Sequence, residues 1–114
     1  MQYVALIYAE EGPWEAFSDT ERESWMARYR AFSREAEAAG VVAGGHELAS
    51  TRDATTVRIR NEDTLVTDGP YAEVKEALGG FYVFDCASLD EAVDWAAKIP
   101  GAEYGAIEVR AYWD

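Results

Sequence analysis

Apolar residues recur along this chain with two periods, and each period predicts a different kind of element. Residues 3–9 (YVALIYA) and 79–86 (GGFYVFDC) are apolar on both alternating sets of positions apart from Asp85, which is typical of strands covered on both faces. Residues 55–60 (TTVRIR) alternate strictly, and we expect Val57 and Ile59 to face inward. The turn NED and the returning run TLVT make this segment a hairpin.

The helical period follows two serines that each stand three residues before a glutamate. Ser18 with Glu21 and Ser88 with Glu91 have the spacing of a capping box, in which a hydroxyl and a carboxylate satisfy free amides at a helix start. The glycine and proline at 12–13 interrupt the chain before the first helix, and Gly40 ends it.

Each predicted helix has one apolar stripe. The stripe of the first helix consists of Trp25, Tyr29, Phe32, Ala36 and Ala39. That of the second, shorter helix consists of Leu89, Val93, Ala96 and Pro100. The aromatic residues of the first stripe could bind a flat cofactor, but aromatic residues at helical spacing are more typical of a core.

Two further strands complete the predicted fold. Residues 41–50 form a strand bent or bulged at Gly44-Gly45, and residues 106–113 form a last alternating strand with Ile107 and Trp113 on the same side. The repeated strand, helix, strand order predicts a ferredoxin-like α+β antiparallel sheet with both helices on one face, in a single domain spanning residues 1–114. Because two helices leave one sheet face bare, we expect a homodimer that packs sheet to sheet.

Composition and charge narrow the range of partners. The chain has 10 basic and 22 acidic side chains, for a formal net charge of −12, so we expect it to bind neither nucleic acid nor anionic membranes. The sequence contains neither a membrane-length apolar run nor a signal-peptide pattern, which predicts a cytoplasmic protein. Cys86 is the single cysteine, and we expect a buried, unreactive thiol.

His46 and Asp68 are the candidates for acid–base chemistry. His46 is the single histidine, it follows two glycines, and imidazole is the side chain best suited to proton transfer near neutral pH. It could equally be a half-buried residue satisfied by a backbone carbonyl. Asp68 opens an Asp-Gly-Pro turn and could simply accept hydrogen bonds from that turn. If Asp68 lies near His46, its carboxylate would orient the imidazole and stabilise its charged form.

The charged segment that follows Asp68 is a candidate substrate-binding wall. Glu73 and Glu76 would share the face of a short helix, and Lys75 could attract an anionic substrate, although such charges are often only solvated. No paired-histidine or cysteine spacing, phosphate-binding loop or nucleophile elbow occurs in the sequence. We therefore expect no metal, no organic cofactor, and neither nucleotide hydrolysis nor acyl-enzyme chemistry.

The residues around both candidates resemble a known family. The segments GGHEL (44–48), VTDGPYAEVKEALGGFYVF (66–84) and AIEVRAYW (106–113) resemble the YCII-related family, and specifically its branch with the Asp-Gly-Pro-Phe signature, the DGPF domain. Tyr71 stands where the phenylalanine of that signature usually is, and RAYW lacks a proline often found after the arginine. Neither difference touches His46 or Asp68.

The resemblance carries expectations about assembly and activity. It implies a dimeric α+β barrel built from two face-to-face sheets, and a kinship with muconolactone-isomerase-like enzymes and a chlorinated-aromatic dehydrochlorinase. It also implies a catalytic His46–Asp68 pair. Beside this pair we expect the substrate to be bound by Gly69, Pro70, Tyr71, Glu73 and Lys75. We expect an enzyme of the lyase or isomerase type acting on a small cyclic or aromatic acid. The alternative is a non-catalytic module that senses a metabolite or associates with a sigma factor, as some relatives are encoded beside such factors.

Overall fold

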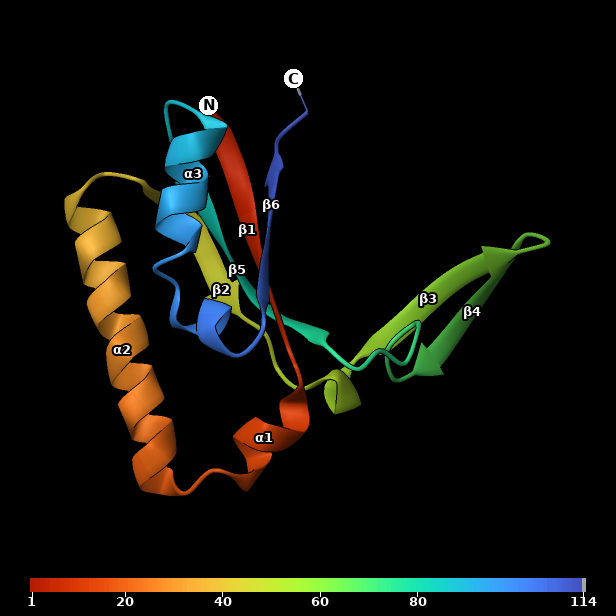
Figure 1. Ribbon diagram of the computed structural model, residues 1–114. Coiled ribbons are helices and arrows are strands. Elements are labelled where there is room, and N and C mark those ends of the chain that lie inside the picture. Colours follow the sequence, from red (N-terminus) through yellow and green to blue (C-terminus); the bar gives the residue numbers. More distant parts are fainter. Residues whose placement is uncertain (114) are drawn as a thin grey trace.

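The computed structural model describes residues 1–113 and is built on one four-stranded antiparallel sheet (Figure 1). Its strands are β1 (Gln2–Ala9), β2 (Val42–Glu47), β5 (Ala77–Asp85) and β6 (Ala106–Ala111), and they lie in the order β2-β5-β1-β6. The two long apolar segments thus occupy the centre of the sheet, as their pattern predicts, and the ferredoxin-like α+β fold is confirmed.

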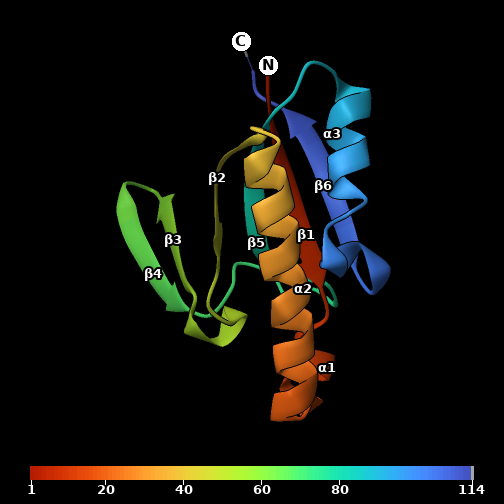
Figure 2. The same cartoon turned by 90° about the vertical axis from the view of Figure 1, so that its left-hand side faces the viewer.

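Both predicted helices lie on one face of this sheet (Figure 2). Helix α2 (Asp19–Ala38) starts with the predicted capping box, since Ser18 Oγ accepts from the amide of Glu21 and the Glu21 carboxylate accepts from the amide of Ser18, each at 3.1 Å. Phe32 of α2 packs edge-on against Tyr82 of β5, with 5.2 Å between ring centroids. The core lies between this helix layer and the sheet, around Phe84, which is fully buried.

Helix α3 (Leu89–Ala96) packs through a different stripe from the predicted one. Leu89 and Val93 are exposed, whereas Ala92 and Ala96 are buried against the sheet. The small side chains let the helix backbone approach the strands closely, so the larger Leu89 and Val93 remain on the solvent side. The 3₁₀ helix η2 (Pro100–Glu103) follows and buries Pro100, as predicted.

A helix also forms where a break is predicted. Helix α1 (Glu11–Ala16) contains Gly12 and Pro13, but Pro13 stands in its first turn, where the amide has no acceptor inside the helix. The final strand ends earlier than predicted, at Ala111, and Trp113 beyond it is 98% exposed. Cys86 is buried, as predicted, and burial raises the pKa of its thiol.

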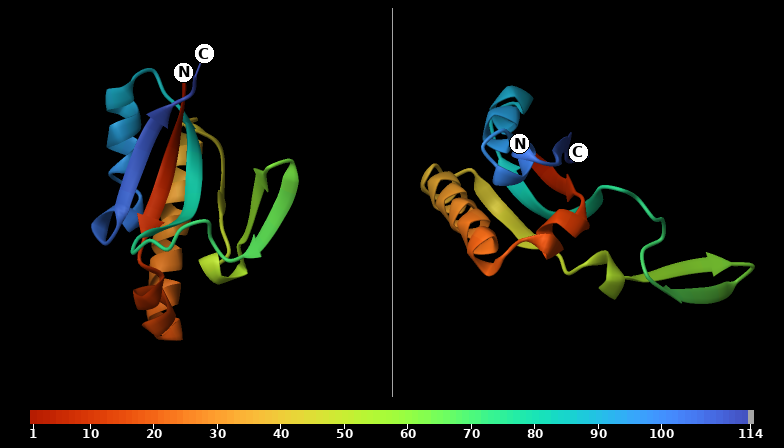
Figure 3. Two further views of the ribbon diagram at one scale, coloured as in Figure 1. Left: turned by 90° about the vertical axis from the view of Figure 1, so that its right-hand side faces the viewer. Right: turned by 60° about the horizontal axis from the view of Figure 1, so that its bottom comes forward.

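The predicted hairpin consists of β3 (Thr55–Arg60) and β4 (Asp63–Asp68) and forms a separate two-stranded sheet. We call this hairpin the arm; it projects away from the body on the side of the sheet opposite α2 and α3 (Figures 1 and 3). Val57 and Ile59 do not face inward as expected, since they are 61% and 66% exposed. The alternation of TTVRIR correctly predicts a strand with one apolar and one polar face, but no other part of residues 1–113 covers the apolar face.

The segment between the arm and β5 does not form the short helix that the spacing of Glu73 and Glu76 suggests. Residues 70–76 follow an irregular path after Gly69, which closes the arm by donating its amide to the carbonyl of Ala54 at 2.7 Å. Gly69 has φ +97°, a conformation that favours glycine. The small 3₁₀ helix η1 (Thr51–Asp53) precedes the arm on its other side.

Candidate functional site

Strand β2 is an edge strand with a bulge, and this irregularity sets the position of His46. The pairing with β5 shifts between Val42 and Gly44, as the Gly-Gly sequence predicts. Gly45 has φ +147°, and a Cβ there would lie 2.5 Å from the carbonyl oxygen of Phe81. Only glycine therefore lets β2 lie this close to β5 immediately before the histidine.

His46 is exposed near the end of β2 and pairs with Phe81 of β5. The two rings are 6.3 Å apart and meet edge to face. Side chains alternate along β5, so His46 shares the face of Phe81, while the next residue, Tyr82, points to the helices. The imidazole thus stands on the side of the sheet that carries no helix.

That side, which we call the open face, is apolar at its centre. Val4 and Leu6 of β1 lie beside Val83 and Phe81 of β5, respectively, and all four are half-buried within the chain alone. His46 borders this apolar area on the β2 side. Glu108 and Arg110 of β6 border it on the opposite side.

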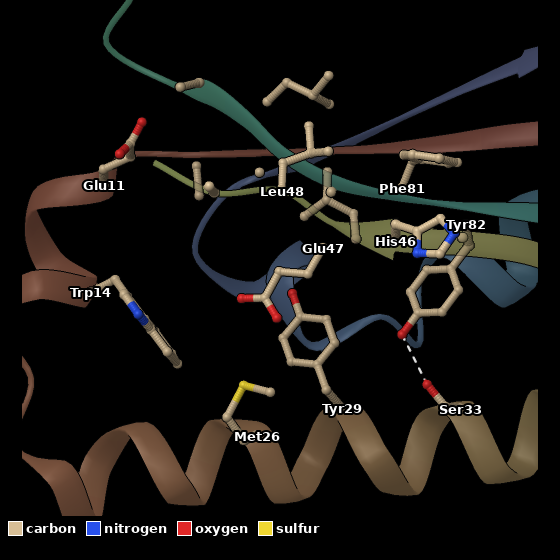
Figure 4. A pocket seen from close by; sticks show the side chains of 18 of the residues that line it. Glu11, Trp14, Met26, Tyr29, Ser33, His46, Glu47, Leu48, Phe81 and Tyr82 are labelled. Carbon is tan, nitrogen blue, oxygen red and sulfur yellow. Dashed lines mark hydrogen bonds between the residues drawn. The ribbon is translucent and has the colours of Figure 1, made fainter. Parts of the chain in front are cut away.

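A cleft of about 1150 Å³ runs along β2 between the sheet, α1 and α2, and His46 is among its lining residues (Figure 4). Trp14 of α1 stands at one end, and Glu47 points from β2 toward Tyr29 and Met26 of α2. At the other end the hydroxyls of Tyr82 and Ser33 are hydrogen-bonded at 3.0 Å. The cleft combines aromatic walls with a few polar groups, which is the usual character of a small-molecule site.

Glu11 fastens α1 to the loop after β2 and so fixes one wall of the cleft. Its carboxylate accepts from Ser50 Oγ at 2.7 Å and from the amide of Thr51 at 3.2 Å. The pKa of Glu11 is lowered by its hydrogen bonds from Thr51 and Ser50, because these bonds favour the charged form. An ion pair between Arg52 and Glu15 at 2.9 Å joins the same two segments.

The α2 wall carries polar residues that the sequence reasoning missed. Burial raises the pKa of Tyr29 far above its usual range and also raises that of Tyr82, so both phenols stay protonated and can donate hydrogen bonds. Arg34 lines the same cleft and has no ion-pair partner among residues 1–113. Ser33 and Arg34 lie next to the apolar stripe of the helix in the sequence. Their position beside this stripe is the feature of the sequence that could have predicted them as cleft residues.

Asp68, the predicted partner of His46, lies on the arm. It is exposed at the end of β4 opposite Thr55, and within residues 1–113 no hydrogen bond or ion pair connects it to His46. The turn after it is held by backbone and by Thr56, whose hydroxyl donates to the carbonyl of Gly69 at 2.8 Å. Asp68 itself does not line the cleft.

The other predicted binding residues also lie outside the cleft. Tyr71 is 77% exposed, and Pro70 and Glu73 are exposed as well. Lys75 reaches back to the body, where it forms an ion pair with Glu10 at 3.3 Å. Of the predicted site residues, the chain thus places His46 at a cleft and gathers Asp68, Gly69, Pro70, Tyr71 and Glu73 on and beside the arm.

The described part of the chain has neither a cluster of metal-binding side chains nor a membrane-spanning helix. Residues 1–113 contain no group of three or more His, Cys, Asp or Glu side chains placed to hold a metal ion. None of the helices formed by these residues is long and apolar enough to span a membrane.

Comparisons with known proteins place this geometry in a family. An uncharacterised protein of Rhizobium meliloti (strain 1021) is 42% identical over 112 residues, which cover 96% of this chain and 90% of that protein. The structure of 5-chloro-2-hydroxyhydroquinone dehydrochlorinase from Burkholderia phenoliruptrix AC1100, in complex with 2,5-dihydroxybenzoquinone, is similar at a TM-score of 0.60 and 15% identity. The similarity covers 99% of this chain and 94% of that chain. The family model of the YCII-related domain matches residues 1–114, so the chain belongs to the YCII-related family.

Proposed function

We propose that this protein is a cytoplasmic enzyme of the lyase or isomerase type that moves a proton on a small cyclic or aromatic acid. His46 takes a proton from a carbon or hydroxyl of the substrate and returns it at another position of the same molecule or to a leaving group. Asp68 orients the imidazole and stabilises its charged form. The exposed segment with Gly69, Pro70, Tyr71, Glu73 and Lys75 closes over the substrate.

One observation carries this proposal: the single histidine is exposed on a strand that glycine brings into close contact with its neighbour, at the edge of the sheet where β2 also lines an aromatic cleft. A proton carrier has to be accessible to substrate and held in a defined position. The exposed His46 ring meets the first condition, and the bulged edge of β2 meets the second. Arg34, which forms no ion pair with the other described residues, offers a guanidinium for the carboxylate or enolate oxygen of such a substrate.

The dehydrochlorinase structure gives the proposal a chemical direction. That protein holds 2,5-dihydroxybenzoquinone, a flat ring with acidic hydroxyls. A ligand of this type suits the cleft here, because Trp14, Tyr29 and Tyr82 supply aromatic walls and the phenols supply donors.

Hydrogen–deuterium exchange tests the proton transfer without knowledge of the final product. The protein is incubated in D₂O with 2,5-dihydroxybenzoquinone or 1,2,4-trihydroxybenzene, and loss of the ring C–H signals is followed by ¹H NMR. We expect exchange above the buffer rate, and a fall of about 100-fold or more in His46→Gln, as is usual when a general acid–base group is removed. Circular dichroism of His46→Gln verifies that the fold is retained.

Equal exchange in the wild type and in His46→Gln would contradict catalysis by His46. In that case the NMR resonances of His46 distinguish between the two non-catalytic alternatives. A ligand-dependent change of the His46 signal without exchange would favour a metabolite-binding module, and no change would favour the alternative of association with a protein such as a sigma factor.

A further inference from the structure

The chain exposes more surface than a compact monomer of its size. Its accessible surface is 7810 Å², whereas about 6,200 Å² is expected for a compact protein of 12.7 kDa. Its radius of gyration is 16.1 Å, whereas about 13 Å is expected for a compact domain of 114 residues. Covering the excess of about 1,600 Å² on each of two chains would bury about 3,200 Å², which is typical of an obligate homodimer.

Two apolar areas contribute to this exposed surface. One is the open face of the sheet, with Val4, Leu6, Phe81 and Val83 at its centre. The other is one face of the arm, where Val57 pairs with Val66, which is 64% exposed, and Ile59 lies next to them. An isolated two-stranded hairpin is only marginally stable in water, so the arm needs a surface to pack against.

Each of these two areas carries one candidate catalytic residue. Residues at alternate positions share a strand face, so Asp68 stands on the same face of the arm as Val66 and Val57. His46 stands on the open face of the sheet beside Phe81. A carboxylate that packs with an apolar surface needs a charged or hydrogen-bonding partner there, and His46 is a suitable one on the surface opposite.

We propose that the apolar face of the arm packs on the open face of a second copy of this chain, beside β2, and thereby brings Asp68 to the partner's His46. The proposal rests on the proposed function, because it completes the same His–Asp pair. Each active site is then assembled from two chains, with the histidine from one sheet and the aspartate from the other chain's arm. The segment after Asp68 reaches the partner's site together with it.

NMR of the single histidine tests the assignment. The ¹⁵N-labelled Asp68→Asn variant is refolded with about a ninefold excess of the unlabelled His46→Ala variant, so that most labelled chains pair with a chain that carries Asp68 but no histidine. We expect the imidazole resonances of His46 to differ between the wild type and Asp68→Asn, and to return to their wild-type positions in the mixed dimer. The matched control Asp63→Asn removes a carboxylate from the opposite face of the arm and is expected to leave these resonances unchanged.

Each other outcome overturns the inference, and the outcomes are distinguishable. If Asp68→Asn moves the His46 signal but mixing does not restore it, the pair forms within one chain, and the proposed function stands without the exchange. If Asp68→Asn leaves the signal in place, the His–Asp pair of the proposed function fails as well. A chain that sediments as a monomer across the concentrations used for NMR has no partner arm, and the inference is wrong.

Discussion

Truncating Ile59 to alanine tests the arm at the centre of its apolar face. The substitution removes three carbons from a side chain that is 66% exposed in the single chain. The structure of the chain itself loses little, because a surface substitution away from special features usually changes the free energy of unfolding by less than about 0.5 kcal/mol. In the proposed dimer the same side chain is buried, so the substitution weakens the association of the two chains.

The expected magnitude follows from the exposed fraction. Burying three carbons is worth about 2.4 kcal/mol, and about two-thirds of this, roughly 1.6 kcal/mol, remains to be gained when the exposed part of the side chain is covered. A twofold dimer contains the contact twice, so Ile59→Ala is expected to weaken association by roughly 3 kcal/mol, or on the order of 100-fold in Kd.

Leu65→Ala is the matched control, because it removes the same number of carbons from the opposite face of the arm. We expect its Kd to stay within about threefold of the wild type, since that face lies toward solvent. Sedimentation with fluorescence detection from picomolar to micromolar concentrations measures all three proteins, and far-UV circular dichroism verifies their folds. Equal effects of the two substitutions, or no effect of Ile59→Ala, would refute the assignment of the buried face.

Three further predictions concern the stability of the single chain. Ser18→Ala removes the capping box and is expected to lower the free energy of unfolding, measured in urea, by about 1 kcal/mol. Ser24→Ala in the same helix is the control and should change this free energy little. Equal effects of the two substitutions would contradict a role for the cap. Gly45→Ala is expected to lower the free energy of unfolding by about 2 kcal/mol or more, because the new Cβ lies 2.5 Å from a backbone carbonyl oxygen. Gly44→Ala should be tolerated, because its Cβ lies 3.8 Å from the nearest atom. A Gly45→Ala variant as stable as the wild type would show that β2 moves freely. The pKa of Glu11 is lowered in the folded state, so its charged form stabilises the fold above the unfolded-state pKa, and this contribution is lost as the pH falls through the folded-state pKa. In urea titrations from pH 7 to pH 3, the wild type should therefore lose stability relative to Glu11→Gln. Parallel stability curves of the two proteins would contradict this prediction.

The sequence predicts the body of the fold well, because the relevant signals are local. The two-faced apolar strands, the serine caps and the glycine bulge each act within a few residues of where they are read, as the bonds of Ser18 with Glu21 illustrate. The apolar pattern of α3, by contrast, predicts the wrong inner face. A ranking by hydrophobicity favours Leu89 and Val93, whereas close packing on a sheet favours Ala92 and Ala96.

The site could be predicted only in part, for a different reason. The position of His46 on a bulged edge strand follows from its own neighbours in sequence. The position of Asp68 depends on how the arm is placed relative to a sheet, and this relation is set by long-range packing. The alternation around Val57 and Ile59 correctly indicates an apolar face, but an alternating pattern contains no information about which chain supplies the covering surface.

The segment that carries the arm, residues 49–76, begins and ends beside a hydrogen bond that joins its two neighbouring strands. The amide of Leu48, just after β2, donates to the carbonyl of Gly79 in β5 at 2.9 Å. Residues 49–76 therefore leave and re-enter the sheet at one point, and the entropic cost of closing the loop depends only weakly on its length. Variants can therefore lengthen, shorten or replace this segment while the core around Phe84 keeps its packing. The residues that fold the sheet are therefore separate from the segment that determines which groups reach His46.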